Sequence, residues 1–174
     1  MNPHAKATEP SDWIARFARL IPPGGTVLDL AAGGGRHARF LHGLGHSIVA
    51  VDRDIGAMAD LAGVPGFELI EADLESGPWP FMGRRFEGIV VANYLHRPLL
   101  PLLIDSLKPR GALIYETFAV GQAEFGRPTN PDFLLKPGEL IEAFGSSLRI
   151  VAYEHGVIAT PRRAAVQRIA ATAA

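Results

Sequence analysis

The sequence predicts an α/β fold: a mostly parallel sheet covered by helices on both faces. Short apolar runs alternate with segments of helical periodicity over residues 26–119, which is typical of βαβ units. The runs VLDL, IVAV and IVVA are apolar almost without a break, as expected for strands buried on both sides. The last two apolar runs are separated only by ATPRR. That gap is too short for a parallel crossover and therefore predicts an antiparallel hairpin at one edge.

Each element follows from its local residue pattern. Residues 11–21 predict a first helix, because apolar residues recur at helical spacing after a Ser11 or Asp12 N-cap and PPGG ends the segment. Further helices are expected at residues 35–45, 55–64, 98–108 and 137–144. Strands are expected at residues 26–32, 47–54, 67–75, 86–96, 112–119, 148–158 and 164–173. A tight turn is expected at residues 109–111.

Length and composition narrow the class of protein. The 174 residues suit one domain over residues 1–174, with an N-terminal helical extension at 1–24 and a long loop at 120–136. A net charge of −1 argues against a nucleic-acid partner. The absence of cysteine excludes disulfides and thiolate metal sites. We expect a cytoplasmic protein with no metal and no membrane segment, because no apolar stretch is long enough for a signal peptide or a span.

Three consecutive glycines, Gly33, Gly34 and Gly35, stand between the first predicted strand and the following helix. In an open α/β sheet this turn lies at the edge where ligands bind. Glycine lets the backbone turn sharply and approach a ligand closely. The same residues also suit a tight turn with close packing and no ligand, so the glycines alone leave both interpretations open.

Two acidic strand ends favour an adenosine-containing ligand. Asp52 lies 19 residues after Gly33, a spacing that places a carboxylate to accept both ribose hydroxyls. At the end of the third strand, Asp73 would accept the adenine amino hydrogens, and the Leu74 N–H would meet a ring nitrogen. The alternatives are a solvated aspartate at Asp52 and ordinary turn chemistry at Asp73.

The choice of cofactor depends on Asp29. The letters GGGRHA satisfy the G-x-G-x-x-A pattern of NAD-binding proteins. However, a carboxylate inside an apolar strand is costly without a partner. The ammonium group of S-adenosylmethionine supplies such a partner, whereas a pyrophosphate would be repelled. The chain also leaves little room for the substrate domain of a dehydrogenase, and the hairpin is foreign to a simple dinucleotide fold.

From about Thr26 onward the chain resembles class I S-adenosylmethionine-dependent methyltransferases. The resemblance rests on VLDLAAGGGRHA, VDRD, EADLE, FEGIVVANYLH and LKPRGALIYETF, in order and at family-like spacing. The LKPGEL helix start is similar to small-molecule enzymes of the tellurite-resistance and thiopurine type. The resemblance implies a Rossmann-like seven-stranded sheet in the order 3-2-1-4-5-7-6 with strand 7 antiparallel. Where the family usually has the first glycine of its motif, this chain has Ala31.

The resemblance also implies a cofactor site. Asp29, Ala31 and the three glycines would hold the methionine part, and Asp52 with Arg53 beside it would hold the ribose. Asp73 and Leu74 would hold the adenine. The backbone carbonyl of Asn93 would flank the sulfonium.

The implied reaction is an in-line methyl transfer to a small-molecule acceptor, which requires positioning and, for a poor nucleophile, a base. Candidates for the base follow strands four and five: Tyr94, His96 and Glu116. His96 is equally suited to capping a helix, and Glu116 to pairing with an arginine. The loop 120–136 is the expected substrate cover, with candidate contacts at Phe125, Arg127 and Asn130. Arg127 would attract an anion or form an ion pair within the loop.

Two other functions stay open at this point. One is an NAD(P)-dependent oxidoreductase. The other is a non-catalytic binding module that keeps the methyltransferase fold. The segment NYLH replaces the Asn/Asp-Pro-Pro-Tyr/Phe signature of amide and exocyclic-amine methylases, which argues against those acceptors. The sequence leaves open whether the protein is a monomer or a homodimer.

Overall fold

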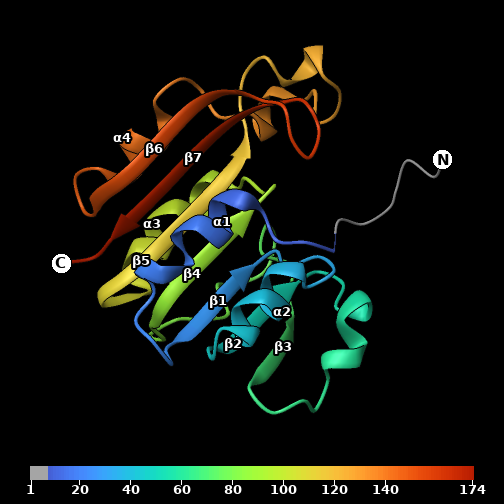
Figure 1. Cartoon of the computed structure of the whole chain (residues 1–174), viewed down its shortest axis with the longest axis vertical. Helices are drawn as coiled ribbons and strands as arrows, with labels where there is room; N and C mark the ends of the chain where they lie inside the picture. Colours follow the sequence, from blue (N-terminus) through green and yellow to red (C-terminus); the bar gives the residue numbers. More distant parts are fainter. Residues whose placement is uncertain (1–7) are drawn as a thin grey trace.

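Seven strands form one sheet in the order β3-β2-β1-β4-β5-β7-β6 (Figure 1). The structure is a computed structural model and describes residues 8–174. The strands are β1 (Thr26–Leu30), β2 (Ser47–Asp52), β3 (Phe67–Glu71), β4 (Phe86–Ala92), β5 (Leu107–Phe118), β6 (Arg149–Ile158) and β7 (Ala164–Thr172). Strands β1 to β5 pair in parallel, and β7 pairs antiparallel with both β5 and β6. The predicted order and the predicted hairpin are confirmed.

Helices cover both faces of the sheet (Figure 1). Helices α1 (Asp12–Phe17) and α2 (Arg36–Gly43), with the 3₁₀ helices η1 (Ala18–Leu20) and η2 (Gly56–Leu61), pack on one core cluster. Helices α3 (Leu100–Asp105) and α4 (Glu139–Phe144), with the 3₁₀ helix η3 (Arg97–Leu99), pack on the other. Two short 3₁₀ helices, η4 (Gln122–Glu124) and η5 (Pro131–Phe133), interrupt the loop after β5. Among residues 8–174, no helix is long and apolar enough to cross a membrane.

The N-terminal helix begins where expected. The Ser11 side chain accepts hydrogen bonds from the N–H groups of Trp13 and Ile14, so Ser11 is the N-cap. The helix is shorter than predicted, because α1 changes to the 3₁₀ helix η1 after Phe17. Of the expected extension 1–24, residues 1–7 lie outside the described residues.

Two predicted helices are wrong in extent or type. Residues 55–64 form only the six-residue 3₁₀ helix η2, and Gly63 with a φ of 77° ends the helical segment. The segment 98–108 divides into η3 and α3, and β5 already begins at Leu107.

Several strands end earlier than predicted. β1 ends at Leu30 and β4 at Ala92, because Ala31 and Asn93 have φ values of 55° and 56°, which interrupt the extended conformation. β3 ends at Glu71. The expected turn at 109–111 lies inside β5, where the register against β4 shifts and Arg110 has a φ of 62°.

The strand directions bring four segments to one edge of the sheet. β6 runs parallel to β5, because β7 is antiparallel to both. The edge where β1, β4, β5 and β6 end therefore carries the glycine turn 31–35, the segment after β4, the loop 120–136 and the β6–β7 turn 159–163 (Figure 1). This is the edge at which open α/β sheets bind ligands.

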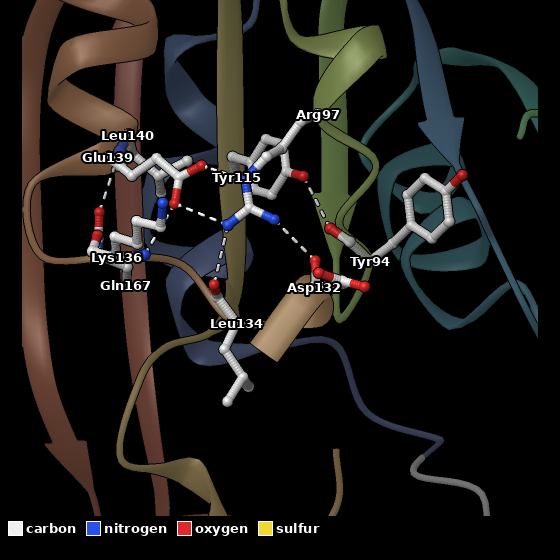
Figure 2. Close-up of polar contacts among 9 residues, drawn as sticks. All are labelled: Tyr94, Arg97, Tyr115, Asp132, Leu134, Lys136, Glu139, Leu140 and Gln167. Atoms are coloured by element: carbon white, nitrogen blue, oxygen red, sulfur yellow. Dashed lines mark hydrogen bonds and ion pairs between the residues drawn. The ribbon is translucent and has the colours of Figure 1, made fainter. Parts of the chain in front are cut away.

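Arg97 holds the C-terminal half of the loop 120–136 (Figure 2). Its guanidinium donates to the carbonyls of Asp132 at 2.8 Å and Leu134 at 3.0 Å. It also forms a two-point ion pair with Glu139 of α4. The Glu139 carboxylate accepts the N–H of Lys136 at 2.8 Å. The loop end, α4 and η3 are thereby joined around one arginine.

Two buried glutamines hold the loop to β7. Gln167 is fully buried, accepts the N–H of Leu140 at 3.0 Å and donates to the Lys136 carbonyl at 2.7 Å (Figure 2). Gln122 accepts the N–H of Ala165 at 2.9 Å and donates to the Arg127 carbonyl at 3.2 Å. Both ends of the loop are therefore fixed by satisfied polar groups.

We predict that Arg97→Gln loosens this loop. The change removes the ion pair with Glu139, and hydrogen bonds to charged groups are each worth roughly 1.5–3 kcal/mol. Amide hydrogen exchange at Val120 and Leu135, which bond across the base of the loop, should accelerate by about tenfold or more. Arg84→Gln is the control, because it breaks an exposed ion pair with Glu68 on β3. Equal acceleration in both variants would contradict the prediction.

Candidate functional site

The glycine turn combines a packing role with an open surface. Gly35 has a φ of 75° and stands at the N-cap of α2, where an added Cβ would come within 2.9 Å of the Met58 side chain. Gly33 has a φ of 57°, but an added Cβ would meet nothing within 4 Å. Gly35 is thus required for close packing, as the ligand-free interpretation supposed, while Gly33 leaves free space at the turn. Ala31 adopts the left-handed conformation without glycine.

Asp29 carries a buried carboxyl group on β1. It is 1% exposed, and its Oδ2 has no hydrogen-bond partner among the described residues. Burial raises the pKa of Asp29 to about 7, although a backbone hydrogen bond from Ala38 and the charge of Arg36 oppose this rise. A buried acid without a cation holds its proton more tightly than in water. A cation placed beside it would therefore favour the ionised form.

Asp52 links the ends of β1 and β2. Its Oδ2 accepts the N–H of Gly33 at 2.7 Å, and its Oδ1 accepts the N–H of Asp54 at 3.2 Å. Each carboxylate oxygen has capacity for a second hydrogen bond. The residue therefore holds the glycine turn in place and retains acceptors that face solvent.

A pocket of about 200 Å³ brings together most of the residues expected around an adenosine. It is lined by Ala31, Asp52, Arg53, Ala72, Asp73, Leu74, Glu75 and Tyr94. The Asp73 carboxylate is already used by its own turn: it accepts the N–H groups of Glu75 at 2.9 Å and Ser76 at 3.2 Å and the Ser76 hydroxyl at 2.6 Å. These bonds lower the pKa of Asp73, with the Ser76 hydroxyl contributing most. The alternative considered for Asp73, ordinary turn chemistry, therefore accounts for these hydrogen bonds.

Tyr94 stands between this pocket and the next one, since it lines both. The Tyr115 hydroxyl donates to the Tyr94 carbonyl at 2.7 Å, which positions the backbone just after β4 (Figure 2). Burial, followed by the charges of Glu75, Asp73 and Asp52, raises the pKa of Tyr94 to about 12. Its hydroxyl therefore stays protonated near neutral pH and is better suited to donate a hydrogen bond than to accept a proton.

A larger pocket, of about 550 Å³, lies beside α1 and the ends of β5, β6 and β7. Its lining includes Asn93, Glu116 and Arg168. Glu116 is 12% exposed and lies 3.8 Å from Arg168, which also pairs with Glu154 at 3.2 Å. Burial raises the pKa of Glu116, while a hydrogen bond with the Ser11 side chain and the charge of Arg168 oppose the rise. Glu116 thus both lines a pocket and pairs with an arginine.

The segment before α1 forms one wall of the larger pocket. The Ser11 N–H donates to Nε2 of His37 at 3.1 Å, and Arg36 donates to the Glu9 carbonyl at 3.2 Å. Burial and the charge of Arg36 lower the pKa of His37 to about 3, so the ring is neutral and able to accept. The start of α2 thereby fixes the N-terminal segment over the site, a contact that the sequence analysis missed.

A third pocket, of about 400 Å³, adjoins the other two. It shares Glu75 and Tyr94 with the smallest pocket, and it shares Asn93, Thr117, Phe118 and Arg162 with the largest. Arg127 and Phe133 of the loop 120–136 also line it. The three pockets therefore form a continuous series along the edge of the sheet.

Some predicted residues lie apart from this series. His96 is half-buried at the N-cap of η3 and lines none of the three pockets formed by the described residues. The Phe125 ring contacts Arg163, whose guanidinium is 5.1 Å from the ring centre. The Asn130 side chain accepts the N–H of Asp132 at 3.0 Å and caps η5. Of the three loop residues expected to contact substrate, only Arg127 lines a pocket.

Arg162 is the main pocket residue that sequence reasoning missed. It lies in the β6–β7 turn and lines both the second and the largest pocket. The implied strand order contained the signal, because it makes strand 6 parallel and brings its end to the ligand edge. Within residues 8–174, no group of three or more His, Cys, Asp or Glu side chains is placed to hold a metal ion.

No protein-family model matches the sequence, and no curated protein matches it. Several solved structures are similar to this chain. TehB from Haemophilus influenzae aligns over 92% of this chain with a TM-score of 0.76 at 16% identity, and this chain spans 61% of its length. An S-adenosylmethionine-dependent methyltransferase from Mesorhizobium loti aligns over 95% of this chain and 100% of its own, with a TM-score of 0.72 at 16% identity.

The glycopeptide N-methyltransferase MtfA, complexed with S-adenosyl-L-homocysteine, aligns over 92% of this chain and 88% of its own, with a TM-score of 0.64 at 20% identity. Sequence identity is low in every case, so the likeness concerns architecture. The chain has the Rossmann-like fold of S-adenosylmethionine-dependent methyltransferases, as the resemblance predicted.

Proposed function

We propose that this protein is an S-adenosylmethionine-dependent methyltransferase acting on a small molecule. The observation that carries the proposal is the buried Asp29 carboxyl group, with an unpartnered oxygen, next to the open glycine turn. A ligand with an ammonium group compensates a buried carboxylate, whereas a pyrophosphate does not. The fold supports the same cofactor, since the similar structure of MtfA was determined with S-adenosyl-L-homocysteine, sinefungin and S-adenosyl-L-methionine.

The residues present fit this cofactor. Asp29 and the turn from Ala31 to Gly35 would hold the methionine part. Asp52 would hold the ribose with the acceptors that Gly33 and Asp54 leave free. The pocket lined by Arg53, Asp73 and Leu74 would hold the adenine, with the Leu74 N–H as donor. Asn93, whose positive φ turns the chain sharply after β4, would flank the sulfonium with its backbone carbonyl.

When bound, the cofactor supplies a methyl group activated by a sulfonium for in-line displacement. The protein then contributes chiefly position. The Tyr94 hydroxyl has no hydrogen-bond partner among the described residues and would donate to a ligand from the boundary between two pockets. Glu116 is better placed than His96 to act as the base, since it lines the largest of the three pockets and His96 does not. It pairs with Arg168, and burial raises its pKa.

The two larger pockets would receive the acceptor. Their volumes of about 550 Å³ and 400 Å³ are in the range of small-molecule sites. The loop 120–136 forms one wall through Arg127 and Phe133, and the Arg97 and Gln122 contacts hold it there. We propose that this loop covers the acceptor and excludes water.

We predict that the protein binds S-adenosylhomocysteine in a calorimetric titration. Asp52→Ala should weaken binding by at least about tenfold, because it removes a charged acceptor for the ribose. Asp60→Ala is the matched control: Asp60 lies in η2, pairs only with Arg39 at the surface and lines none of the three pockets of the described chain. Failure of the intact protein to bind, with NADH binding instead, would contradict the proposal and favour an oxidoreductase.

We predict that Asp29 makes the ligand-free protein less stable as pH rises. In the unfolded chain this carboxyl ionises near 3.8, whereas in the folded protein its pKa is about 7. Between these values the folded state binds more protons, so the free energy of unfolding falls with rising pH, by an amount on the order of 4 kcal/mol. Urea unfolding at pH 5 and pH 8 covers about 2.6 kcal/mol of this loss, and Asp29→Asn should remove most of the difference between the two pH values. An unchanged slope in the variant would refute the assignment.

We also predict that S-adenosylhomocysteine binding releases a proton at pH 6. Asp29 is mostly protonated there in the free protein, because its pKa is about 7, and the ligand's ammonium would favour the ionised form. Calorimetry in two buffers of different ionisation enthalpy measures the proton count. About one proton should be released by the intact protein and none by Asp29→Asn. No release by the intact protein would argue against contact between Asp29 and the ammonium.

A further inference from the structure

Resting on the proposed function, we infer the chemical class of the acceptor. We propose that it is a small aromatic molecule carrying an anionic group, and that Arg127 and Arg162 bind that group in the pocket of about 400 Å³. The aromatic part would lie against Tyr94, Phe118 and Phe133.

The lining of this pocket offers contacts to an aromatic body. Its walls carry three aromatic rings, together with Leu95 and Pro128. Its uncharged polar residues, Asn93 and Thr117, stand near the ends of β4 and β5, and its charged residues are Glu75, Arg127 and Arg162. A mostly apolar pocket with a few convergent polar groups is typical of a site for a small organic ligand.

Two arginines reach this pocket from separate segments. Arg127 belongs to the loop 120–136 and Arg162 to the turn between β6 and β7. Neither forms an ion pair within residues 8–174, whereas Arg97 and Arg168 are paired with carboxylates. A guanidinium stays charged at every physiological pH and offers a planar set of donors that suits carboxylate or phosphate. The two free arginines therefore form a receptor for an anion.

Different contacts position the two arginines. The Arg127 carbonyl accepts a hydrogen bond from the buried Gln122 at 3.2 Å, which fixes the backbone at Arg127. The Arg162 guanidinium lies over the Phe118 ring at 5.9 Å, which keeps its donors beside the pocket. For Arg162, less side-chain freedom is then lost when a ligand binds.

The distribution of charge separates this pocket from its neighbours. Its one acidic residue, Glu75, is shared with the smallest pocket, while Arg162 is shared with the largest. Glu75 and Arg162 thus stand at different ends. The anionic group would lie at the arginine end, and the sulfonium of the cofactor would add to the attraction of an anion.

The test compares neighbouring arginines in the protein loaded with S-adenosylhomocysteine. The probes are benzoate, phenylacetate and phenyl phosphate, each beside its neutral counterpart benzamide, phenylacetamide or phenol, with affinities from calorimetry or ligand-observed NMR. At least one anion should bind about tenfold more tightly than its counterpart, as expected for a charge-assisted contact. Arg162→Gln and Arg127→Gln should each remove most of that preference and leave the neutral probe unchanged.

Arg163→Gln is the matched control. It removes the same charge from the same turn, but Arg163 lies over Phe125 and lines none of the three pockets of the described residues. It should keep the full preference for the anion. Equal loss in Arg163→Gln, no preference for any anion, or no binding of any anion would overturn the inference. Loading is measured separately for each variant, so a failure to bind S-adenosylhomocysteine would count against the proposed function and not against the acceptor class.

Discussion

Because β7 runs antiparallel between β5 and β6, the loop that leaves β5 and the turn that enters β7 lie at the edge where the parallel strands end. With this arrangement, Ala31, the loop 120–136 and the turn 159–163 line one set of pockets. The site therefore depends on the direction of one strand.

Buried polar side chains act together with apolar contacts to hold the loops at that edge. Gln122 and Gln167 are almost fully buried and bond to backbone groups of the loop or of α4. His37 does the same for the segment before α1. Buried polar groups are favourable only in the geometry that satisfies them. The walls of the pockets are thus specified by hydrogen bonds that allow few alternative conformations.

Asp29 differs from these residues, because its Oδ2 lacks a partner among the described residues and its pKa is about 7. A group of this kind reduces the stability of the free protein and favours a ligand that satisfies it. Arg127 and Arg162 are different, because they are exposed and hydrated, but neither forms an ion pair within residues 8–174. The buried Asp29 carboxyl group and the two arginines without ion pairs are the groups on which the proposed ligand binding rests.

Local sequence determined the strand positions, the N-cap at Ser11, the glycine turn and the acidic strand ends, because apolar period, caps and turns are properties of a few consecutive residues. It failed for residues 55–64, where the chain forms a six-residue 3₁₀ helix in place of the expected α-helix. Only the tertiary structure decided that Arg162 and Arg127 line one pocket and that His96 lines none of the three described pockets. Those arrangements bring together residues that are far apart in the chain. They depend on the strand order and on the contacts that anchor the loops, and no local sequence pattern encodes either.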